Sequence, residues 1–453
     1  MIHRYTLKGK NFLLDVNSGS VHLLDNVTYA VSGLIGEDME KECPADLPAK
    51  IPDYAPEEIQ EAYGELWALK EAGMLFAKDD YIDVSRYIPA GAPVKALCLH
   101  VAHDCNLRCE YCFASTGDFG TGRKIMPFEV AKKAIDFVIK RSGARKNIEV
   151  DFFGGEPLMA METVKKTVEY ARSLEPATGK QFRFTITTNG LLLEEESIRY
   201  INETMNNVVL SLDGRKAVND AMRKTVNGTG SYDVILPRFQ DLVSKRDKTL
   251  DYFVRGTFTK ENLDFAEDVQ HIAEAGFDRL SVEPVAAEAK YSYALSEEDL
   301  PQIYAEYERL CDFILDKHNK GEDLSFFHFM VDLEQGPCVI KRLRGCGAGY
   351  EYVAVTPEGD IYPCHQFVGN PAYRQGSVLE DTLDDAMAQK FAAMNIYTRE
   401  QCRDCWAKFY CSGGCSAANY LMNGDLQKPY HMGCEMEKKR LECAIYLKAA
   451  MQE

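Results

Sequence analysis

The segment CNLRCEYC, residues 105–112, carries residues whose spacing points directly to chemistry, because three of its eight positions are cysteines. Thiolates at Cys105, Cys109 and Cys112 lie close enough along the chain to bind one metal centre. A cubane cluster has four irons and a tetrahedral zinc ion takes four ligands, yet this three-cysteine segment offers three thiolates and no histidine. The sequence therefore predicts a metal centre whose last ligand comes from elsewhere.

A second group of cysteines follows a longer rule beyond residue 340. Cys346 is followed by Gly359, and four residues separate that glycine from Cys364. The remaining members of this seven-cysteine array have the order CxxC, five residues, C, three residues, C, and then a last cysteine: Cys402, Cys405, Cys411, Cys415 and Cys434. Such regular spacing indicates further metal centres.

The composition limits where these thiols work. The N-terminal sequence MIHRYTLKGK lacks the apolar core of a signal peptide, so we expect a cytoplasmic protein in which the 15 cysteines stay reduced. Cysteines outside the two patterns should be small buried apolar residues: Cys43, Cys98, Cys311 and Cys443.

The charge narrows the range of partners. With 70 acidic and 52 basic side chains the net charge is -18, which repels phosphate backbones and argues against a nucleic-acid partner. No stretch approaches the roughly 20 apolar residues needed to cross a bilayer, so we expect no membrane partner. A basic or neutral peptide fits this charge better.

Six segments have the composition of buried strands, and amphipathic helices such as 127–143 and 162–174 fit between them. Alternating strands and helices predict parallel strands with right-handed crossovers, here an α/β fold that forms a partial (β/α)6 barrel of the TIM type. The predicted strands are residues 94–101, 147–153, 182–188, 206–213, 252–258 and 279–285.

Chemistry in such barrels sits at the carboxyl ends of the strands. The three-cysteine segment follows the first predicted strand, and GGEP (154–157), TTNG (187–190) and SLDG (211–214) end the next three. Any one of these could be an ordinary turn. Four at the same end of one barrel favour an active site.

The first 88 residues read as a separate unit. Residues 5–25 alternate apolar and polar side chains around the turn NSGS, which predicts short antiparallel strands, and helices are expected at 26–36 and 56–75. This order resembles a winged-helix fold, and the proline- and glycine-containing stretch 83–94 suits a linker. We predict domains at 1–88, 89–318 and 319–453.

The motif CxxxCxxC at the end of a first barrel strand, followed by GGEP, resembles the radical S-adenosylmethionine (SAM) superfamily. The resemblance implies that SAM itself chelates the fourth iron through its amino and carboxylate groups, so the missing ligand is the substrate site. One electron from the reduced cluster then cleaves SAM to methionine and a 5'-deoxyadenosyl radical, which removes hydrogen from unactivated carbon.

The resemblance also assigns SAM-binding residues by motif. Tyr111 packs near adenine, and Asn189 contacts the ribose or the amino-acid part. The remaining positions receive the methionyl ammonium (Gly154, Gly155 and Glu156) or the methionyl carboxylate and ribose (Ser211 and Arg223). The sixth strand end, SVEPV, departs from the glycine-rich pattern of many members, which leaves its adenine contacts open.

One alternative is a zinc knuckle in which His103 is the fourth ligand of the three cysteines. It leaves GGEP and the other strand ends unexplained. A colourless protein with stoichiometric zinc and no iron after anaerobic reconstitution would favour it.

The seven-cysteine array resembles the SPASM extension of radical enzymes that modify peptides, which implies two auxiliary [4Fe-4S] clusters and three clusters in all. In that family the outer cluster is held by the equivalents of Cys402, Cys405, Cys411 and Cys434, and the inner cluster by those of Cys346, Cys364 and Cys415. Either Cys338 or a substrate thiolate completes the inner cluster, and we favour the thiolate. Loss of the inner cluster in a Cys338→Ala protein would contradict this. The clusters could also act only as structural staples, but a chain of two also suits electron removal from a product radical.

His365 is a candidate catalytic residue. In members that oxidise a sulfatase cysteine or serine, an aspartate follows the cysteine equivalent to Cys364 and acts as the base, whereas this chain has His365. Histidine can accept a proton, although a histidine beside a cluster also occurs as a structural hydrogen-bonding residue.

The N-terminal unit resembles peptide-recognition domains of enzymes that modify ribosomally made peptides, and LLDVNSGSVHLLDNVTYAV is especially similar to maturases of the cysteine-rich SCIFF peptides. The resemblance implies that a leader peptide adds as a strand beside residues 20–24, Ser20 to Leu24. A unit that only caps the barrel is the alternative. The run KKR at 438–440 reads as a solvated helix face, and Trp67 and Trp406 as packing residues.

Together these features predict a maturase that bonds a cysteine sulfur to an α-carbon in a cysteine-rich precursor peptide, with threonine as the expected acceptor, and that takes electrons from a flavodoxin- or ferredoxin-type donor. An anaerobic sulfatase-type formylglycine enzyme is the nearest alternative. A non-catalytic iron-sulfur electron carrier is the alternative from another class.

Overall fold

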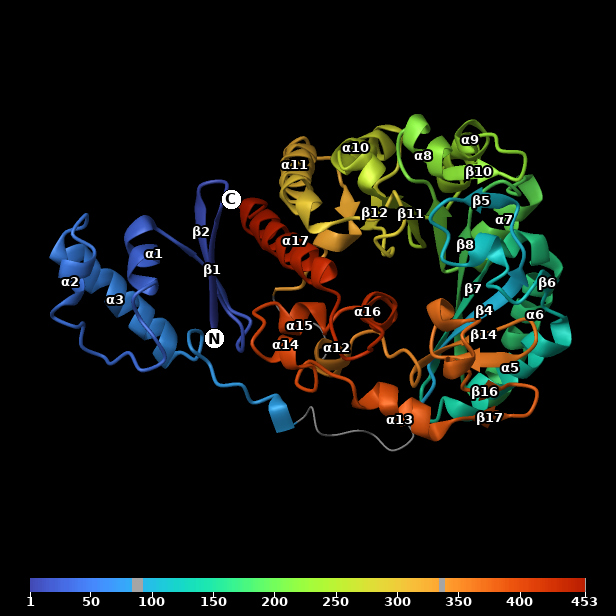
Figure 1. The fold of residues 1–453 in the computed structure, drawn as a ribbon, viewed down its shortest axis with the longest axis horizontal. Coiled ribbons are helices and arrows are strands. Elements are labelled where there is room, and N and C mark those ends of the chain that lie inside the picture. Colours follow the sequence, from blue (N-terminus) through green and yellow to red (C-terminus); the bar gives the residue numbers. More distant parts are fainter. Residues whose placement is uncertain (84–92, 334–338, 453) are drawn as a thin grey trace.

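The barrel predicted from the sequence is confirmed in the computed structural model, which describes residues 1–83, 93–333 and 339–452 (Figure 1). Its six strands run parallel in the spatial order β12-β11-β9-β8-β7-β4. Their bounds are β4 Ala96–His103, β7 Asn147–Gly154, β8 Gln181–Thr188, β9 Asn207–Ser211, β11 Asp251–Phe258 and β12 Arg279–Pro284.

The strands alternate because each has one face against helices and the other toward the barrel interior. In β7, Ile148, Val150 and Phe152 are fully buried. Asp151 and Phe153, which alternate with them along the strand, are only partly buried. The helices between the strands are α5 Phe128–Arg141, α6 Met161–Thr178, α7 Glu195–Thr204, α8 Lys216–Met222, α9 Tyr232–Ser244, α10 Phe265–Glu274 and α11 Leu300–Asn319. One face of the sheet therefore forms the core, and the other is left for a site.

The C-terminal region is hydrogen bonded into the same sheet. Strand β14 (Tyr352–Val355) pairs in parallel with β4, and the antiparallel strands β15 (Asp360–Tyr362), β16 (Gly376–Ser377) and β17 (Thr382–Leu383) extend it. The β14–β15 hairpin leads directly into Cys364. At the opposite edge β13 (Ser325–Phe326) pairs with β12.

Two short pairings shape the loops at the barrel mouth. Strand β5 (Leu107–Cys109), inside the three-cysteine segment, pairs with β10 (Arg223–Thr225), so that Cys109 lies opposite Arg223. Strand β6 (Lys124–Ile125) pairs with the end of β4.

The predicted N-terminal strands are also present, as a three-stranded sheet of β1 (Ile2–Leu7), β2 (Lys10–Asp15) and β3 (Val21–Leu24). A turn at Lys8 and Gly9, which adopt positive φ angles of 48° and 77°, divides β1 from β2. This turn was not predicted from the sequence. Its helices are α1 Asn26–Ser32, α2 Leu47–Lys50 and α3 Pro56–Glu71. Most of the predicted linker 83–94 lies outside the described residues.

This sheet packs on the C-terminal helix α17 (His431–Ala450), as the blue and red elements of Figure 1 show. The Tyr5 hydroxyl donates to the carbonyl oxygen of Glu442 at 3.2 Å, and the His3 ring stacks on Trp406 at 3.7 Å. Trp406 is thus a packing residue, as predicted. The N-terminal sheet consequently shares a core with the rest of the chain.

Helix α17 corrects one prediction. The run KKR was expected to be a solvated face, but the side chains of Lys439 and Arg440 are each only 12% exposed. They are buried because α17 packs on both α11 and the N-terminal sheet. The other C-terminal helices are α12 Val339–Arg344, α13 Asp385–Ala393, α14 Glu400–Arg403, α15 Lys408–Cys411 and α16 Ser416–Asn423. Within the described ranges, no helix combines the length and the apolar character that a bilayer crossing requires.

Replacing Phe12 tests the docking of the N-terminal sheet. Phe12 is fully buried, stacks on Tyr5 at 5.0 Å and meets Tyr446 of α17 edge-on at 6.4 Å. We expect Phe12→Ala to lower the free energy of unfolding by about 3–5 kcal/mol, measured by anaerobic denaturant titration. Leu23→Ala, at a position that is 50% exposed on β3, should change it by about 0.5 kcal/mol or less. Equal losses would show that packing on α17 is not what stabilises the sheet.

Candidate active site

The loop that carries the first three cysteines packs tightly on the glycines that end β7. A β-carbon at Gly155 would lie 2.2 Å from the carbonyl oxygen of Asp104, and one at Gly117 would lie 2.5 Å from the β-carbon of Cys105. Gly154 has a φ of 132°. The backbone amide of the next residue, Gly155, donates to the carbonyl oxygen of Ala102 at 2.8 Å. Only glycine allows this approach, which fixes the position of the loop.

Two thiols of this loop, those of Cys105 and Cys109, are protonated in the absence of a cation. Burial, together with the neighbouring Glu156, Cys109 and Cys112, raises the pKa of Cys105 to about 12. Burial likewise raises the pKa of Cys109 to about 11. A cationic centre is therefore needed to make these groups thiolates.

A small cavity of about 150 Å³ lies against the three cysteines, and we call it the loop cavity. All the residues expected to bind SAM line it: Tyr111, Gly154, Gly155, Glu156, Asn189, Ser211 and Arg223. They come from the carboxyl ends of three neighbouring strands, β7, β8 and β9, from the start of β10 and from the cysteine loop, so the structure brings the whole predicted set together.

Glu156 has structural contacts in addition to its expected role as an ammonium ligand. Its buried carboxylate already accepts from the Thr188 hydroxyl at 2.8 Å and from the Asn189 amide at 2.8 Å, as well as from a backbone amide of its own loop. Burial raises the pKa of Glu156 to about 7. The side chain joins the ends of β7 and β8 and presents Asn189, whose Nδ2 lies 3.6 Å from the Cys105 sulfur.

Asp213 is a buried residue that the sequence reading missed. It accepts from the Tyr111 hydroxyl at 2.7 Å, and the same hydroxyl accepts from Nη1 of Arg223 at 3.0 Å. Arg223 and Asp213 form an ion pair at 3.9 Å. From the sequence, the motif SLDG (211–214) was placed at the barrel mouth, but its aspartate was given no role.

The zinc alternative does not fit this geometry. His103 is buried with Nε2 3.1 Å from His100 Nδ1 and with Nδ1 2.8 Å from the Thr121 hydroxyl, so neither ring nitrogen faces the cysteines. Over residues 1–83, 93–333 and 339–452, no three histidine, cysteine or acidic side chains converge closely enough to hold a single metal ion. A cubane cluster, whose ligands are farther apart, is compatible with this wider spacing.

The later cysteines form two groups. Cys346, Cys364 and Cys415 are mutual neighbours, and burial raises the pKa of Cys364 to about 12. The other group surrounds Cys411, and burial raises the pKa of Cys434 in it to about 11. This second group is Cys402, Cys405, Cys411 and Cys434. The two groups match the interleaved order expected for inner and outer clusters, while Cys338 lies outside the described residues.

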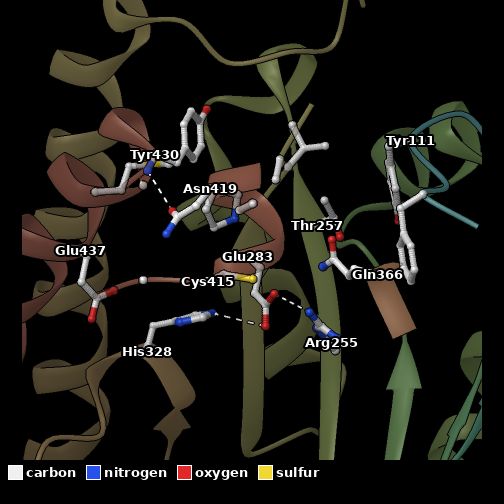
Figure 2. A pocket seen from close by; sticks show the side chains of 18 of the residues that line it. Tyr111, Arg255, Thr257, Glu283, His328, Gln366, Cys415, Asn419, Tyr430 and Glu437 are labelled. Atoms are coloured by element: carbon white, nitrogen blue, oxygen red, sulfur yellow. Dashed lines mark hydrogen bonds and ion pairs between the residues drawn. The ribbon is translucent and has the colours of Figure 1, made fainter. Parts of the chain in front are cut away.

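A larger space of about 560 Å³, the central cavity, lies between the loop cavity and these cysteines (Figure 2). Tyr111, Ser211 and Arg223 line both cavities, so the two spaces adjoin. Cys411, Cys415 and Cys434 line the central cavity from the C-terminal region. A molecule in this space would therefore lie between the SAM-side residues and the later cysteines.

His365 lines the central cavity next to Cys364. Its Nδ1 lies 3.3 Å from the Tyr352 hydroxyl, and its ring packs on Phe113 and Phe153. Burial, assisted by Arg255, lowers the pKa of His365 to about 4. A base of this strength is a poor match for proton abstraction near neutral pH.

The remaining scattered cysteines are as predicted in three of four cases. Cys98, Cys311 and Cys443 are buried in the cores, whereas Cys43 is only partly buried.

Comparisons with known proteins agree with this geometry. Residues 99–269 match the radical SAM superfamily, and residues 346–406 match the SPASM iron-sulfur cluster-binding domain. A cysteine-type anaerobic sulfatase-maturating enzyme of Clostridium perfringens is 24% identical, covering 78% of this chain and 96% of the relative. The mycofactocin maturase MftC of Mycobacterium tuberculosis is 26% identical, covering 75% and 82%.

Solved structures are similar in fold. Native anSMEcpe with bound AdoMet and Kp18Cys peptide has a TM-score of 0.65 at 22% identity and covers 79% of this chain and 99% of that one. Streptococcus suis SuiB bound to S-adenosylmethionine has a TM-score of 0.54 at 18% identity and covers 96% and 98%. The second match extends over the N-terminal sheet.

The barrel, its cysteine loop and the cysteine array thus define a radical SAM enzyme with a SPASM domain. Within that class the chain is related in sequence to the sulfatase-maturating enzyme and MftC, and it shares the fold of SuiB. Its cofactors are SAM, the radical SAM [4Fe-4S] cluster and the SPASM auxiliary clusters.

The described residues fit these cofactors. The Nε of Arg223 is buried and has no hydrogen-bond partner among them, which suits an anionic group such as the SAM carboxylate. The buried thiols of Cys105 and Cys109 suit an iron-sulfur cluster, because a cationic centre is what would convert them to thiolates.

Gly155→Ala tests the packing of the cysteine loop. The added methyl group would displace the backbone at Asp104 and with it Cys105, so we expect the variant to lose the radical SAM cluster, about four irons per chain. Iron analysis after anaerobic reconstitution measures this. Gly64→Ala is the matched control, because Gly64 lies in α3 with no atom within 4 Å of an added β-carbon. Full iron content in both variants would contradict the role of this contact.

Proposed function

We propose that the protein is a peptide maturase that forms thioether bonds between a cysteine sulfur and an α-carbon of a cysteine-rich precursor peptide. One observation carries the proposal: Cys415 and the SAM-side residues Ser211 and Arg223 line the same cavity. A peptide segment there can reach both at once. Bringing a sulfur and an activated carbon together in one site is the requirement for such a bond.

In this proposal the three cysteine groups hold the three clusters as the family pattern assigns them. Cys105, Cys109 and Cys112 hold the radical SAM cluster, and the inner and outer clusters are held by the later groups. When bound, the first cluster and SAM supply a 5'-deoxyadenosyl radical that removes hydrogen from carbon.

The protein's own residues position the two reactants. Asp213 orients Tyr111 and Arg223 toward the loop cavity. At the other side of the central cavity, Cys346, Cys364 and Cys415 supply three ligands, and Cys415 is exposed to the cavity. We propose that a substrate thiolate takes the fourth position, which would hold the sulfur next to the reacting carbon.

Formylglycine formation is the second candidate, because a cysteine-type sulfatase-maturating enzyme is among the relatives. His365 argues against it. A histidine stands where that family has the aspartate that acts as the base.

Leader binding at β3 completes the proposal. The sheet has the order β1-β2-β3, so β3 is an edge strand, and Leu23 on it is 50% exposed. A space of about 680 Å³ lies beside Val21 and Leu23, with Ile445 and Ala449 of α17 on its other side. An added peptide strand would lie between an edge and a helix. In a related structure, SuiB is bound to its precursor peptide SuiA.

Mass spectrometry of the cysteine-rich peptide encoded beside the gene tests the reaction. We expect each turnover to remove two hydrogens, to retain sulfur and to protect one cysteine from alkylation, since the thiol becomes a thioether. Cys105→Ala, which lacks one ligand of the radical SAM cluster, should give unmodified peptide. A product in which cysteine has lost its sulfur to become an aldehyde would instead support the formylglycine activity.

Leu23→Asp tests the leader site. A charge on the apolar edge of β3 should weaken binding of the full precursor about tenfold or more, measured by anaerobic fluorescence anisotropy, because it would be buried on strand addition. A peptide without its leader should bind both proteins alike. Val234→Asp, at a position that is 42% exposed on α9, is the control. Unchanged affinity in Leu23→Asp would leave the N-terminal sheet as a cap only.

A further inference from the structure

A row of charged side chains forms one wall of the central cavity, and none of its members was assigned to the site from the sequence. This charged wall consists of Arg255, Glu283, His328, Arg440 and Glu437. Arg255 lies on β11 and Glu283 near the end of β12, two strands that pair in parallel. Figure 2 shows Glu283 between Arg255 and His328.

Two pairs of side chains in the charged wall are hydrogen bonded. Arg440 donates through Nη1 to Nδ1 of His328 at 3.0 Å, which assigns the imidazole proton to Nε2. That Nε2 lies 3.4 Å from the Ser281 hydroxyl and 4.0 Å from the Glu283 carboxylate. Glu283 in turn accepts from Nη2 of Arg255. The 4.0 Å separation of His328 from Glu283 is too long for a hydrogen bond, so the contact that holds the Arg255 side chain directly is the one with Glu283.

Arg255 is the most exposed of the three guanidinium groups that line the cavity. Its side chain is 47% exposed, compared with 12% for Arg440 and 9% for Arg223. Its ion pair with Glu283 uses Nη2. A guanidinium has five N–H donors in a planar fork, so donors remain for a ligand.

The charges around the cavity indicate a neutral ligand. Each of its three guanidinium groups has its own carboxylate: Arg223 has Asp213, Arg255 has Glu283 and Arg440 has Glu437. Without excess positive charge, the wall offers little to hold a small anion in the cavity. Spare N–H donors beside apolar side chains such as Phe113, Phe153 and Val285 suit the carbonyl groups and side chains of a peptide.

We propose that Arg255 binds backbone carbonyl oxygens of the peptide segment in the central cavity, and that Glu283 is a positioning residue that orients its guanidinium group. This inference rests on the proposed function in taking the substrate to be a peptide. It adds the group that sets which α-carbon faces the loop cavity. A bidentate donor fixes both the position and the rotation of a peptide unit, which a point charge does not.

Coupling between SAM cleavage and peptide modification is the property that such an anchor controls. If the peptide is held loosely, SAM is still cleaved but the hydrogen removed is not the right one. A displacement of about 1 Å can cost on the order of 100-fold in rate. The ratio of 5'-deoxyadenosine formed to peptide modified therefore reports on the anchor directly.

The experiment compares Arg255→Lys, Glu283→Gln and Arg279→Lys with the wild-type protein carrying all its clusters. Arg255→Lys keeps the charge and removes the fork, whereas Glu283→Gln removes the charge that orients it. Arg279→Lys is the matched control, because Arg279 pairs with Asp251 at 2.6 Å across β11 and β12 at the other end of the barrel.

For Arg255→Lys and Glu283→Gln we expect the ratio of 5'-deoxyadenosine to modified peptide to rise about tenfold, together with the KM for peptide. Iron content and SAM cleavage without peptide should stay at the wild-type level, and Arg279→Lys should match the wild type throughout. A ratio and a KM unchanged in Arg255→Lys would overturn the proposal. Because Arg255 is exposed to the cavity, its replacement leaves the core intact.

Failure of this inference differs from failure of the proposed function. A wild-type product without a thioether would refute the function, while the ratio measured with that product would still test Arg255. Wild-type thioether formation with unchanged ratios in both variants would refute only the anchor.

Discussion

The close contact between the three-cysteine loop and the glycines at the end of β7 is the constraint on which the rest of the site depends. Because Gly155 has no side chain, the loop backbone at Asp104 approaches it directly, and Cys105 takes its place over the barrel mouth. The pairing of β5 with β10 then brings Arg223 opposite Cys109. Cofactor ligands and substrate-side groups are thus held by backbone contacts, which vary less than side-chain contacts.

Charge in the site is kept close to balance by pairing. Asp213 neutralises Arg223, and Glu283 neutralises Arg255, so each buried or half-buried cation has a partner within the barrel. Leaving a buried ion such as Asp213 unpaired would be costly. Pairing also leaves directional N–H donors available for recognition.

Cysteine spacing and strand order were predictable from the sequence because both are local patterns. The six barrel strands alternate with helices, and the glycine, asparagine and serine motifs end consecutive strands. Asp213 and Glu283 were missed because their roles depend on partners 102 and 28 residues away. Arg440 was misread as solvated since its burial comes from packing of α17 on two elements distant in the sequence. For Glu156, the sequence indicated its place but not that its carboxylate also accepts hydrogen bonds from Thr188 and Asn189.

Strand β14 lies in register with β4 within one continuous sheet. The loop after β4 carries the first cysteines, and the hairpin that begins with β14 leads into Cys364. The two groups of cysteines are therefore anchored on adjacent strands whose backbones are hydrogen bonded to each other. Their separation across the central cavity is thus set by the width of one strand pairing and by the two loops that follow it.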